Sequence, residues 1–471
     1  MSGRAGTLSA MTATLPSLTP DAAREAMAAQ MPFIRQALGE LVAYRSVHST
    51  PGLEADNAGA SDWVVNAFRE VGVPVEAHET SDGSTTVIGL REPDEGQPTV
   101  LLYSHYDVQP ATDVDNWTSS PWELTERDGR WYGRGAADCK GHVVLHLAVL
   151  RILNELTGPD DPKIGVRVVV EGSEERGGYG LEDLLDAQPE LFAADTFLIV
   201  DSGNDAEGVP AVATALRGTA PVTVTVDTLN QPMHSGQYGG AAPDALLALI
   251  RLLSTLHDDN GLVAVDGLTS DVRWEGRGPD PETFRRDAGV LDGVDVIGEA
   301  QGLLPNDLTV ARPSITVTGL DSLTVADAVN AVPGHAAAHV SLRIPPGMDP
   351  KEGQDALVRH LESHVPGHAK VTIERDTLAS PFSADTSGPA LALLMQSLAD
   401  AYGAEETAQI GSGGSIPLSN ALLEKYPDAE LALFGIEEPA CRIHSADESV
   451  SPDEIFHVGT AELLFLARST R

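Results

Sequence analysis

Cysteine is scarce in this sequence: two residues in 471 are too few for a disulfide framework and are typical of a reducing compartment. Basic residues are scarce as well, since 30 Lys plus Arg stand against 70 Asp plus Glu and give a formal net charge of -40. That balance excludes a nucleic-acid binder, which needs a basic face to displace counterions from phosphates. No apolar run approaches the ~18 residues of a membrane helix, and the N-terminal residues lack the basic and apolar segments of a secretory signal. We therefore expect a cytoplasmic protein that binds neither membrane nor nucleic acid.

Apolar runs of strand length alternate with helical patterns in the first part of the chain. Residues 99–104, 164–172 and 196–201 are runs rich in Val, Ile and Leu, and residues 139–156 form a long helical pattern. Continuous apolar runs separated by helices are typical of buried parallel strands joined by crossover helices. We predict an α/β domain with a mainly parallel sheet covered by helices.

The pattern changes near residue 216. From there, segments such as 221–227 and 335–344 alternate apolar and polar residues, which favours an antiparallel sheet with one buried and one solvated face. A single hydrophobic core stops growing beyond about 250 to 300 residues, so a chain of this length holds at least two domains. We predict an α+β domain inserted into the α/β domain. The predicted parts are residues 1–215 and 385–471 for the α/β domain and residues 216–384 for the inserted domain.

Polar side chains stand where the predicted parallel strands end. His105 and Asp107 follow the first strand, Glu174 and Glu175 follow the second, and Asp201 closes the third. In open α/β sheets the binding site lies outside the carboxyl ends of the strands, so these side chains can converge on one crevice. Each of them alone has an ordinary explanation, such as a solvated loop for the two glutamates. The joint arrangement is the specific signal.

Imidazole and carboxylate side chains together predict a metal site. These donors suit zinc and similar divalent ions. Asp138, just before the long helical pattern, adds another carboxylate. Two divalent ions would be neutralised by three carboxylate ligands and a bridging hydroxide, and each ion then needs an imidazole. We predict His444 as the second imidazole.

Four motifs carry a resemblance to a known family. They are LLYSHYDVQP from residue 101, WYGRGAADCKGH from 131, VVVEGSEERGG from 168 and CRIHSADES from 441. Together they resemble the metal-binding motifs of the M20 family of metallopeptidases, and within it the carnosinase-like dipeptidases. The resemblance implies two divalent metal ions per subunit, zinc or else manganese or cobalt. The metal ligands that it implies are His105, Asp138 as the bridge between both ions, Glu175, Asp201 and His444.

The resemblance also implies catalytic roles. Asp107 would orient the His105 imidazole, and Glu174 would be the general base that takes a proton from a metal-bridging water and passes it to the leaving amine. The peptide bond after Asp138 is characteristically cis in the family. Cys139 stands where the family commonly has a second Asp, which leaves the bridging ligand intact. We interpret Cys139 as a small buried side chain.

The inserted domain resembles the lid and dimerisation domain of the family. By that resemblance His234, in MHSGQYGG, reaches the active site of the other subunit of a homodimer and donates to the oxygen of the tetrahedral intermediate. Asn330 and Arg343 match positions that hold the substrate, and arginine suits a bidentate grip on a peptide carboxylate. Ser415, in GSGGSIPLS, matches the substrate-binding loop.

The leading hypothesis is a metallo-dipeptidase or exopeptidase that cleaves the amide bond of small peptides with a free C-terminal carboxylate. An N-acyl amino acid deacylase of the same family is the first alternative. The long segment 258–310 favours the peptidase, because deacylases of the family tend to have a shorter lid. A non-catalytic metal-binding scaffold is the remaining alternative. Glu174 and His234 count against it, since a scaffold needs neither a base nor an oxyanion donor.

Overall fold

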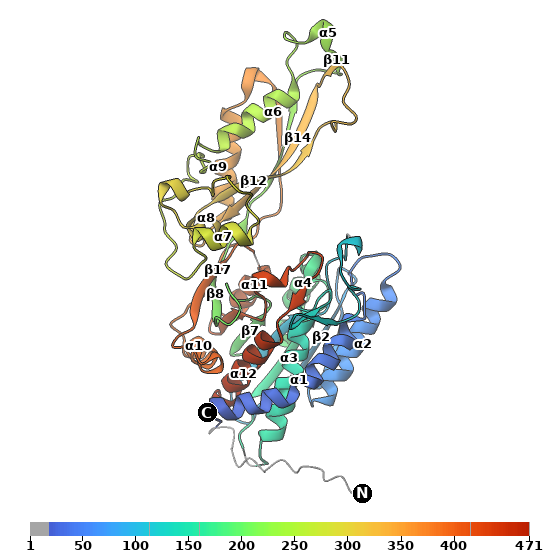
Figure 1. Ribbon diagram of the computed structural model, residues 1–471, viewed down its shortest axis with the longest axis vertical. Helices are drawn as coiled ribbons and strands as arrows, with labels where there is room; N and C mark the ends of the chain where they lie inside the picture. Colours follow the sequence, from blue (N-terminus) through green and yellow to red (C-terminus); the bar gives the residue numbers. More distant parts are fainter. Residues whose placement is uncertain (1–17, 113, 160, 415, 471) are drawn as a thin grey trace. The chain divides into compact units, whose positions relative to one another are not determined.

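The structure is a computed structural model that describes residues 18–470 apart from 113, 160 and 415. The described chain divides into two compact units (Figure 1). The first unit holds the described residues up to 212 together with 385–408 and those from 421 onward, and the second unit holds 213–384 and 409–420. The described residues of 409–420 therefore group with the second unit, and residues 385–408 group with the first. None of the described helices is both long and apolar enough to span a membrane.

The first unit is built on a sheet whose central strands are parallel. β3 (Thr99–His105) lies between β6 (Gly165–Glu171) and β7 (Thr196–Val200) and runs parallel to both. β18 (Glu430–Phe434) runs parallel to β7 on its other side. All residues of β6 and β7 are buried, which explains their continuous apolar sequences. The predicted α/β class and its parallel strands are confirmed.

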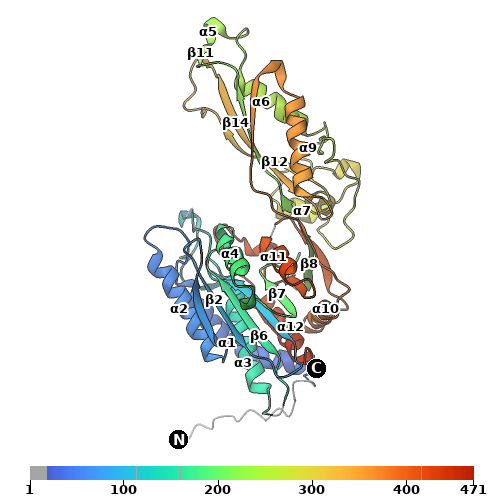
Figure 2. The same cartoon turned by 180° about the vertical axis from the view of Figure 1, so that it is seen from behind.

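Antiparallel strands extend this sheet beyond β6. β2 (Thr85–Arg91) pairs with β6, and β1 (Val75–Glu79) pairs with β2, both antiparallel. Figure 2 shows β2 and β6 side by side, seen from behind. The sheet is therefore mixed, with parallel strands at its centre. A smaller sheet in the order β19-β5-β4 consists of Ser449–Val450, Arg130–Tyr132 and Thr125–Arg127.

Helices of the first unit pack on one another as well as on the sheet. α1 (Pro20–Val42), α3 (Lys140–Leu156) and α12 (Pro452–Arg468) contact each other, and α10 (Pro389–Tyr402) contacts α12. Residues 140–150 of α3 are all buried, as expected of a helix enclosed by other elements. The remaining helices that belong to this unit wholly or in part are α2 (Glu54–Glu70), α4 (Tyr179–Ala187) and α11 (Pro417–Lys425).

The second unit contains the antiparallel sheet that the sequence predicts. Its strands follow the order β12 (Ser314–Asp321), β14 (His335–Ile344), β10 (Val222–Asp227) and β15 (Lys370–Arg375). β9 (Gly218–Thr219) pairs with the end of β14. Alternate residues of β10 are buried, so one face of this sheet forms the core.

Two helices cover the buried face of this sheet. Leu249 of α6 (Ala245–Leu253) and Leu357 of α9 (Pro350–Ser363) belong to the same core cluster as Val224 of β10. In the segment 258–310 the structure describes short helices, turns and isolated β-bridges at Val263 and Arg277. The remaining elements in or beside this unit are α5 (Ser235–Tyr238), α7 (Pro281–Asp287), α8 (Pro305–Thr309), β8 (Ala211–Leu216), β11 (Met233–His234), β13 (Ala331–Val332), β16 (Phe382–Ser383) and β17 (Ala408–Ser412).

Candidate metal centre and active site

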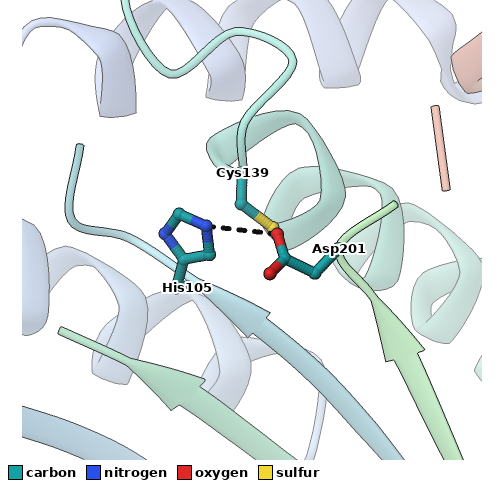
Figure 3. Close-up of side chains that lie close together, drawn as sticks. All are labelled: His105, Cys139 and Asp201. Carbon is teal, nitrogen blue, oxygen red and sulfur yellow. Dashed lines mark ion pairs between the residues drawn. The ribbon is translucent and has the colours of Figure 1, made fainter. Parts of the chain in front are cut away.

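Three parallel strands bring their carboxyl ends to one edge of the first unit's sheet. β3 ends at His105, β6 leads into the 3-10 turn that begins at Glu174, and Asp201 directly follows β7. Parallel strands end at the same edge, so their terminal side chains meet there. His105 Nε2 lies 3.2 Å from Asp201 Oδ1 and 4.0 Å from Glu174 Oε2. Figure 3 shows the His105 and Asp201 side chains facing one another.

The Asp138 carboxylate lies between two imidazoles. Its Oδ1 is 3.0 Å from His105 Nε2, and its Oδ2 is 2.9 Å from His444 Nε2. The same nitrogen of His444 is 3.1 Å from Glu175 Oε2. Two groups of close donor atoms result. One group consists of His105, Cys139 and Asp201, and the other consists of Asp138, Glu175 and His444. Asp138 joins the two groups, because its two oxygens contact His105 and His444.

The charge of this cluster fits divalent cations. Among the described residues, the carboxylates of Asp138, Asp201, Glu174 and Glu175 form their ion pairs only with histidines. Burial and the neighbouring Asp201 carboxylate raise the pKa of Glu174 well above its usual range. Hydrogen bonds with Asp138 and Glu175 raise the pKa of His444 to about 10. The site thus attracts positive charge, and its imidazole and carboxylate donors are those that zinc and related ions prefer.

Asp107 fixes the geometry around His105 through two different groups. Its main-chain carbonyl oxygen lies 3.0 Å from His105 Nδ1, and its carboxylate Oδ1 lies 3.4 Å from the same nitrogen. The Asp107 carboxylate also accepts the backbone N–H groups of Glu174 at 3.1 Å and Glu175 at 3.2 Å. Nδ1 therefore faces oxygen acceptors, which favours a proton there and leaves the Nε2 lone pair for a metal.

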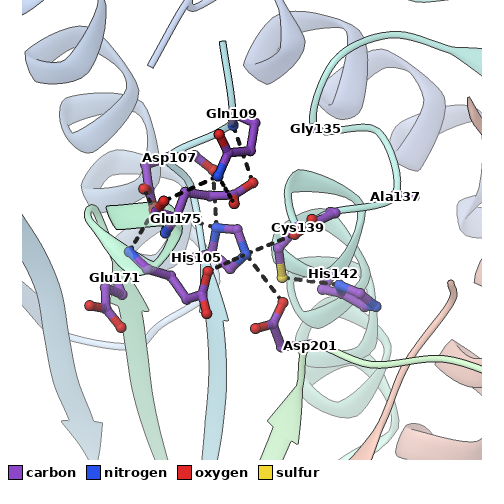
Figure 4. A network of polar contacts seen from close by, with 12 residues as sticks. His105, Asp107, Gln109, Gly135, Ala137, Cys139, His142, Glu171, Glu175 and Asp201 are labelled. Carbon is purple, nitrogen blue, oxygen red and sulfur yellow. Dashed lines mark hydrogen bonds and ion pairs between the residues drawn. The ribbon is translucent and has the colours of Figure 1, made fainter. Parts of the chain in front are cut away.

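Gln109 holds the Glu175 carboxylate, a contact that the sequence analysis missed. Its backbone N–H donates to Glu175 Oε1 at 3.1 Å, and its side-chain Nε2 donates to Oε2 at 2.9 Å. Figure 4 shows these contacts beside His105 and Asp107. Two donors from one residue fix the orientation of the Glu175 carboxylate, whose Oε2 also lies 3.1 Å from His444 Nε2.

Glu448 positions the loop that carries Asp138. Its buried carboxylate accepts the backbone N–H groups of Gly135 at 3.1 Å, Ala137 at 3.2 Å and Asp138 at 3.3 Å. The Arg134 guanidinium pairs with the same carboxylate. The peptide bond between Asp138 and Cys139 is cis, the geometry that the family resemblance implies. Glu448 lies inside the CRIHSADES motif, which was the available signal for this role.

Cys139 is buried, as the sequence analysis expects, and it is hydrogen-bonded on two sides. Its Sγ lies 3.0 Å from His142 Nδ1 and 3.3 Å from the Val200 carbonyl oxygen. His142 Nε2 accepts the Ile436 backbone N–H at 2.9 Å, so the imidazole proton sits on Nδ1 and points to the sulfur. The thiol thus links α3 to the residue that precedes Asp201.

His234 and Asn330 lie together in the second unit. Residues 233–234 of β11 pair with 331–332 of β13, and the Asn330 carbonyl accepts the Ser235 backbone N–H at 2.9 Å. Both His234 and Asn330 are exposed. His234 Nδ1 accepts the Gly236 backbone N–H at 3.1 Å, so its own proton is on Nε2. The exposed imidazole can therefore donate a hydrogen bond to another molecule.

Arg343 lies on β14 opposite Ser314 of β12 and is partly exposed. Among the described residues its side chain takes part in no hydrogen bond or ion pair within the chain. It is therefore available to an anionic ligand. Ser415, which the sequence analysis assigned to substrate binding, lies outside the described residues.

Histidine and carboxylate ligands at the carboxyl edge of a parallel sheet are typical of metallohydrolases, and a family model narrows this class further. The model of peptidase family M20/M25/M40 matches residues 101–468, which is most of the chain. The chain belongs to this family, and it is a metallodipeptidase. The resemblance to M20 peptidases and their carnosinase-like dipeptidases is confirmed.

Similar proteins extend this result over nearly the full length. The chain is 46% identical over 458 residues to the cysteinylglycine-S-conjugate dipeptidase of Corynebacterium striatum, covering 97% of this chain and 98% of that protein. It is 27% identical over 341 residues to the Beta-Ala-His dipeptidase of Homo sapiens, with 69% and 66% covered. The crystal structure of human carnosine dipeptidase 1 shares the fold, with a TM-score of 0.80 at 22% identity over 96% of this chain and 99% of that chain.

Proposed function

We propose that the protein uses two divalent metal ions to hydrolyse dipeptides or short peptides that carry a free C-terminal carboxylate. The observation that carries this proposal is the Asp138 carboxylate, whose two oxygens face the imidazoles of His105 and His444 at 3.0 and 2.9 Å. A carboxylate in that position suits a bridge between two ions. The relative from Corynebacterium striatum, a dipeptidase by name, supports cysteinylglycine and its S-conjugates as the first substrates to test.

The proposed ligands divide between two ions. Asp138 serves both ions, and zinc fits two imidazoles and several carboxylates, with manganese or cobalt as substitutes. When bound, the two ions supply Lewis acidity toward the scissile carbonyl and lower the pKa of a bound water. The proposed ligands are His105 and Asp201 for one ion and Glu175 and His444 for the other.

Glu174 is the proposed general base. Its side chain remains 27% exposed at the edge of the cluster, whereas that of Asp201 is 7% exposed. Its backbone is held by the Asp107 carboxylate, which fixes the turn that presents it. A base there can accept a proton from the attacking water and donate it to the leaving amine.

The proposal includes a homodimer in which His234 acts in the partner's site. The second unit supports this with exposed apolar side chains on two elements, Leu247 and Ile250 of α6 and Val317 and Leu320 of β12. β12 is also an edge strand of its sheet, and an edge strand with exposed apolar side chains is suited to pairing with another chain. A cytoplasmic location is proposed because Cys139, like the other cysteine, is buried and free.

A substrate and metal screen tests the proposed function. Metal-stripped protein would be loaded with zinc, manganese or cobalt and assayed on cysteinylglycine, an S-substituted cysteinylglycine, β-alanylhistidine and N-acetyl amino acids. Metal-dependent hydrolysis of the dipeptides, with two ions per chain at full activity, is the expected result. Faster hydrolysis of N-acetyl amino acids than of dipeptides would instead establish a deacylase.

Replacing Arg343 with alanine should weaken activity on free dipeptides more than on C-terminally amidated ones. The guanidinium is proposed to bind the carboxylate, and a charge-assisted hydrogen bond is worth about 1.5 to 3 kcal/mol, which corresponds to roughly tenfold to hundredfold in KM. KM is measured for the free dipeptide and for the amidated dipeptide, in the parent protein and in the variant. Arg359→Ala, at an exposed position of α9, is the matched control. Equal losses of activity on both substrates would refute the proposed contact between Arg343 and the substrate carboxylate.

A further inference from the structure

A second arginine lies beside Arg343 in the second unit. Arg217 follows β8, and its Nη1 donates to the Ser314 hydroxyl at 2.6 Å and to the Leu308 carbonyl at 3.4 Å. Ser314 is the direct cross-strand neighbour of Arg343 on antiparallel strands. Side chains at such opposed positions lie on the same face of the sheet. The Arg217 guanidinium therefore reaches the face on which Arg343 lies.

Neither of the two guanidinium groups has an anionic partner within the described chain. The Arg217 side chain donates only to neutral oxygens, and its buried Nε has no acceptor. This is unexpected in a chain with 70 Asp and Glu, because a buried cation without a counter-ion is costly. Burial and the Arg343 charge lower the pKa of Arg217 to about 10, which still leaves it charged at neutral pH. The Arg343 guanidinium is charged as well, because a guanidinium keeps its proton in proteins. Two unpaired cations side by side indicate a place for an external anion.

The glycine-rich segment 411–414 borders the Arg217 side chain. A Cβ at Gly413 would stand 3.0 Å from Arg217 Nη2, and the Arg217 backbone N–H donates to the Ser412 carbonyl at 3.3 Å. A Cβ at Gly411 would collide with Val310 at 2.2 Å. The absence of a side chain at Gly413 lets the backbone approach the guanidinium closely, whereas its absence at Gly411 leaves room for Val310. Arg217 Nη2 has no acceptor among the described residues. It lies next to Gly413, which has no side chain to cover it.

We propose that Arg217 joins Arg343 in binding the substrate's C-terminal carboxylate and is a second determinant of specificity for free peptides. The inference rests on the proposed function, because it takes the substrate to be a peptide with a free carboxylate. A carboxylate has two oxygens with about four acceptor positions, more than one guanidinium fork satisfies. Arg343 supplies one fork, and Arg217 Nη2 supplies further donors. The same pair of cations discriminates against amides, which carry no charge to neutralise them.

Variants of Arg217 test this assignment on cysteinylglycine and its C-terminal amide. Arg217→Met removes the charge and keeps most of the length, so KM for cysteinylglycine should rise about tenfold or more with kcat little changed. KM for the amide should change less than about twofold, because the amide makes no ionic contact. Arg217→Lys should give an intermediate rise on the free peptide alone. Arg359→Met on α9 is the matched control and should leave both substrates unaffected.

Four outcomes would overturn the inference. They are an equal rise in KM on both substrates, a loss confined to kcat, unchanged KM on both, and an Arg217→Lys protein that folds and keeps the parent preference for the free peptide. The first two would make Arg217 a structural support for Ser314 and the glycine segment. Thermal unfolding of each variant checks folding, and the lysine variant decides the matter if the methionine variant is unstable. The proposed function is tested separately, since it fails if the unmutated enzyme hydrolyses no dipeptide.

A double-mutant cycle adds an independent readout. If both arginines bind one carboxylate, the free-energy cost of Arg217→Met plus Arg343→Met should differ from the sum of the single costs, since contacts to a shared group are coupled. The ratio of kcat/KM for the free and amidated peptide is measured in parent, single and double variants. Strict additivity of the two effects on that ratio would place the arginines on separate ligands and refute the shared site.

Discussion

Replacing Glu174 with glutamine should lower kcat by about 10² to 10⁴, the usual contribution of general-base catalysis, and leave the metal content near that of the parent. Glutamine keeps the size and shape of the side chain, but it cannot accept the proton of the attacking water. The metal ions should stay bound because Glu174 lies farther from the His105 imidazole than the proposed ligands Asp138 and Asp201 do. Its Oε2 is 4.0 Å from His105 Nε2, against 3.0 Å for Asp138 and 3.2 Å for Asp201.

Asp138→Asn is the contrasting variant for this prediction. Each of its carboxylate oxygens faces a different imidazole, so the loss of one anionic oxygen should release at least one ion. Turnover and metal stoichiometry are measured on the same purified samples of both variants. Loss of both ions from the Glu174→Gln protein would assign Glu174 to metal binding and remove it as the base.

Replacing His234 with alanine should lower kcat by roughly 10² to 10³, the usual effect of removing one oxyanion donor. The imidazole has its proton on Nε2, because Nδ1 accepts the Gly236 backbone N–H, and the ring is exposed. It is thus a donor with no acceptor of its own among the described residues. His335→Ala, at an exposed histidine of the same unit, is the matched control and should retain activity.

Mixing two inactive proteins tests whether His234 acts across the proposed dimer. In a heterodimer of His234→Ala and Glu174→Gln subunits, one of the two sites combines an intact Glu174 with an intact partner histidine. Random exchange of equal amounts makes about half of the dimers mixed, so about one quarter of the parent activity should return. Activity is followed with time after mixing, and exchange is checked by mass spectrometry of differently tagged subunits. Full exchange without recovery would mean that His234 serves its own chain.

The strand-end side chains could be placed from the sequence because parallel strands share one edge. His105 and Asp201 are the first polar residues after apolar runs, and a parallel sheet brings such positions together whatever the loops do. In the structure the two side chains lie 3.2 Å apart at that edge. The antiparallel sheet of the second unit was likewise predictable, since alternate residues of β10 are apolar and buried.

The residues that hold the side chains of this cluster in place could not be predicted from the sequence in the same way. Glu448 accepts backbone N–H groups more than 300 residues earlier in the chain, and no periodicity encodes such a contact. Gln109 follows a strand end as Asp107 does, but nothing in its residue type marks it as the partner of Glu175. The sequence also could not show that the Asp107 carbonyl, rather than its carboxylate, is the closer acceptor for His105. A sequence names the residue but does not show whether its side-chain or its backbone oxygen accepts a hydrogen bond.

The two imidazoles of the cluster differ sharply in their access to water. The His105 side chain is 0% exposed and that of His444 is 51% exposed, although both contact Asp138. In the proposed two-metal site, an ion held by the exposed His444 should therefore exchange with bulk solution sooner than an ion held by the buried His105, because water and chelators reach an exposed ligand directly. Partial depletion of the proposed site should then leave a population with a single ion at His105. On that proposal, the occupancy of the His444 position, and with it the fraction of active enzyme, should follow the free metal concentration around the protein.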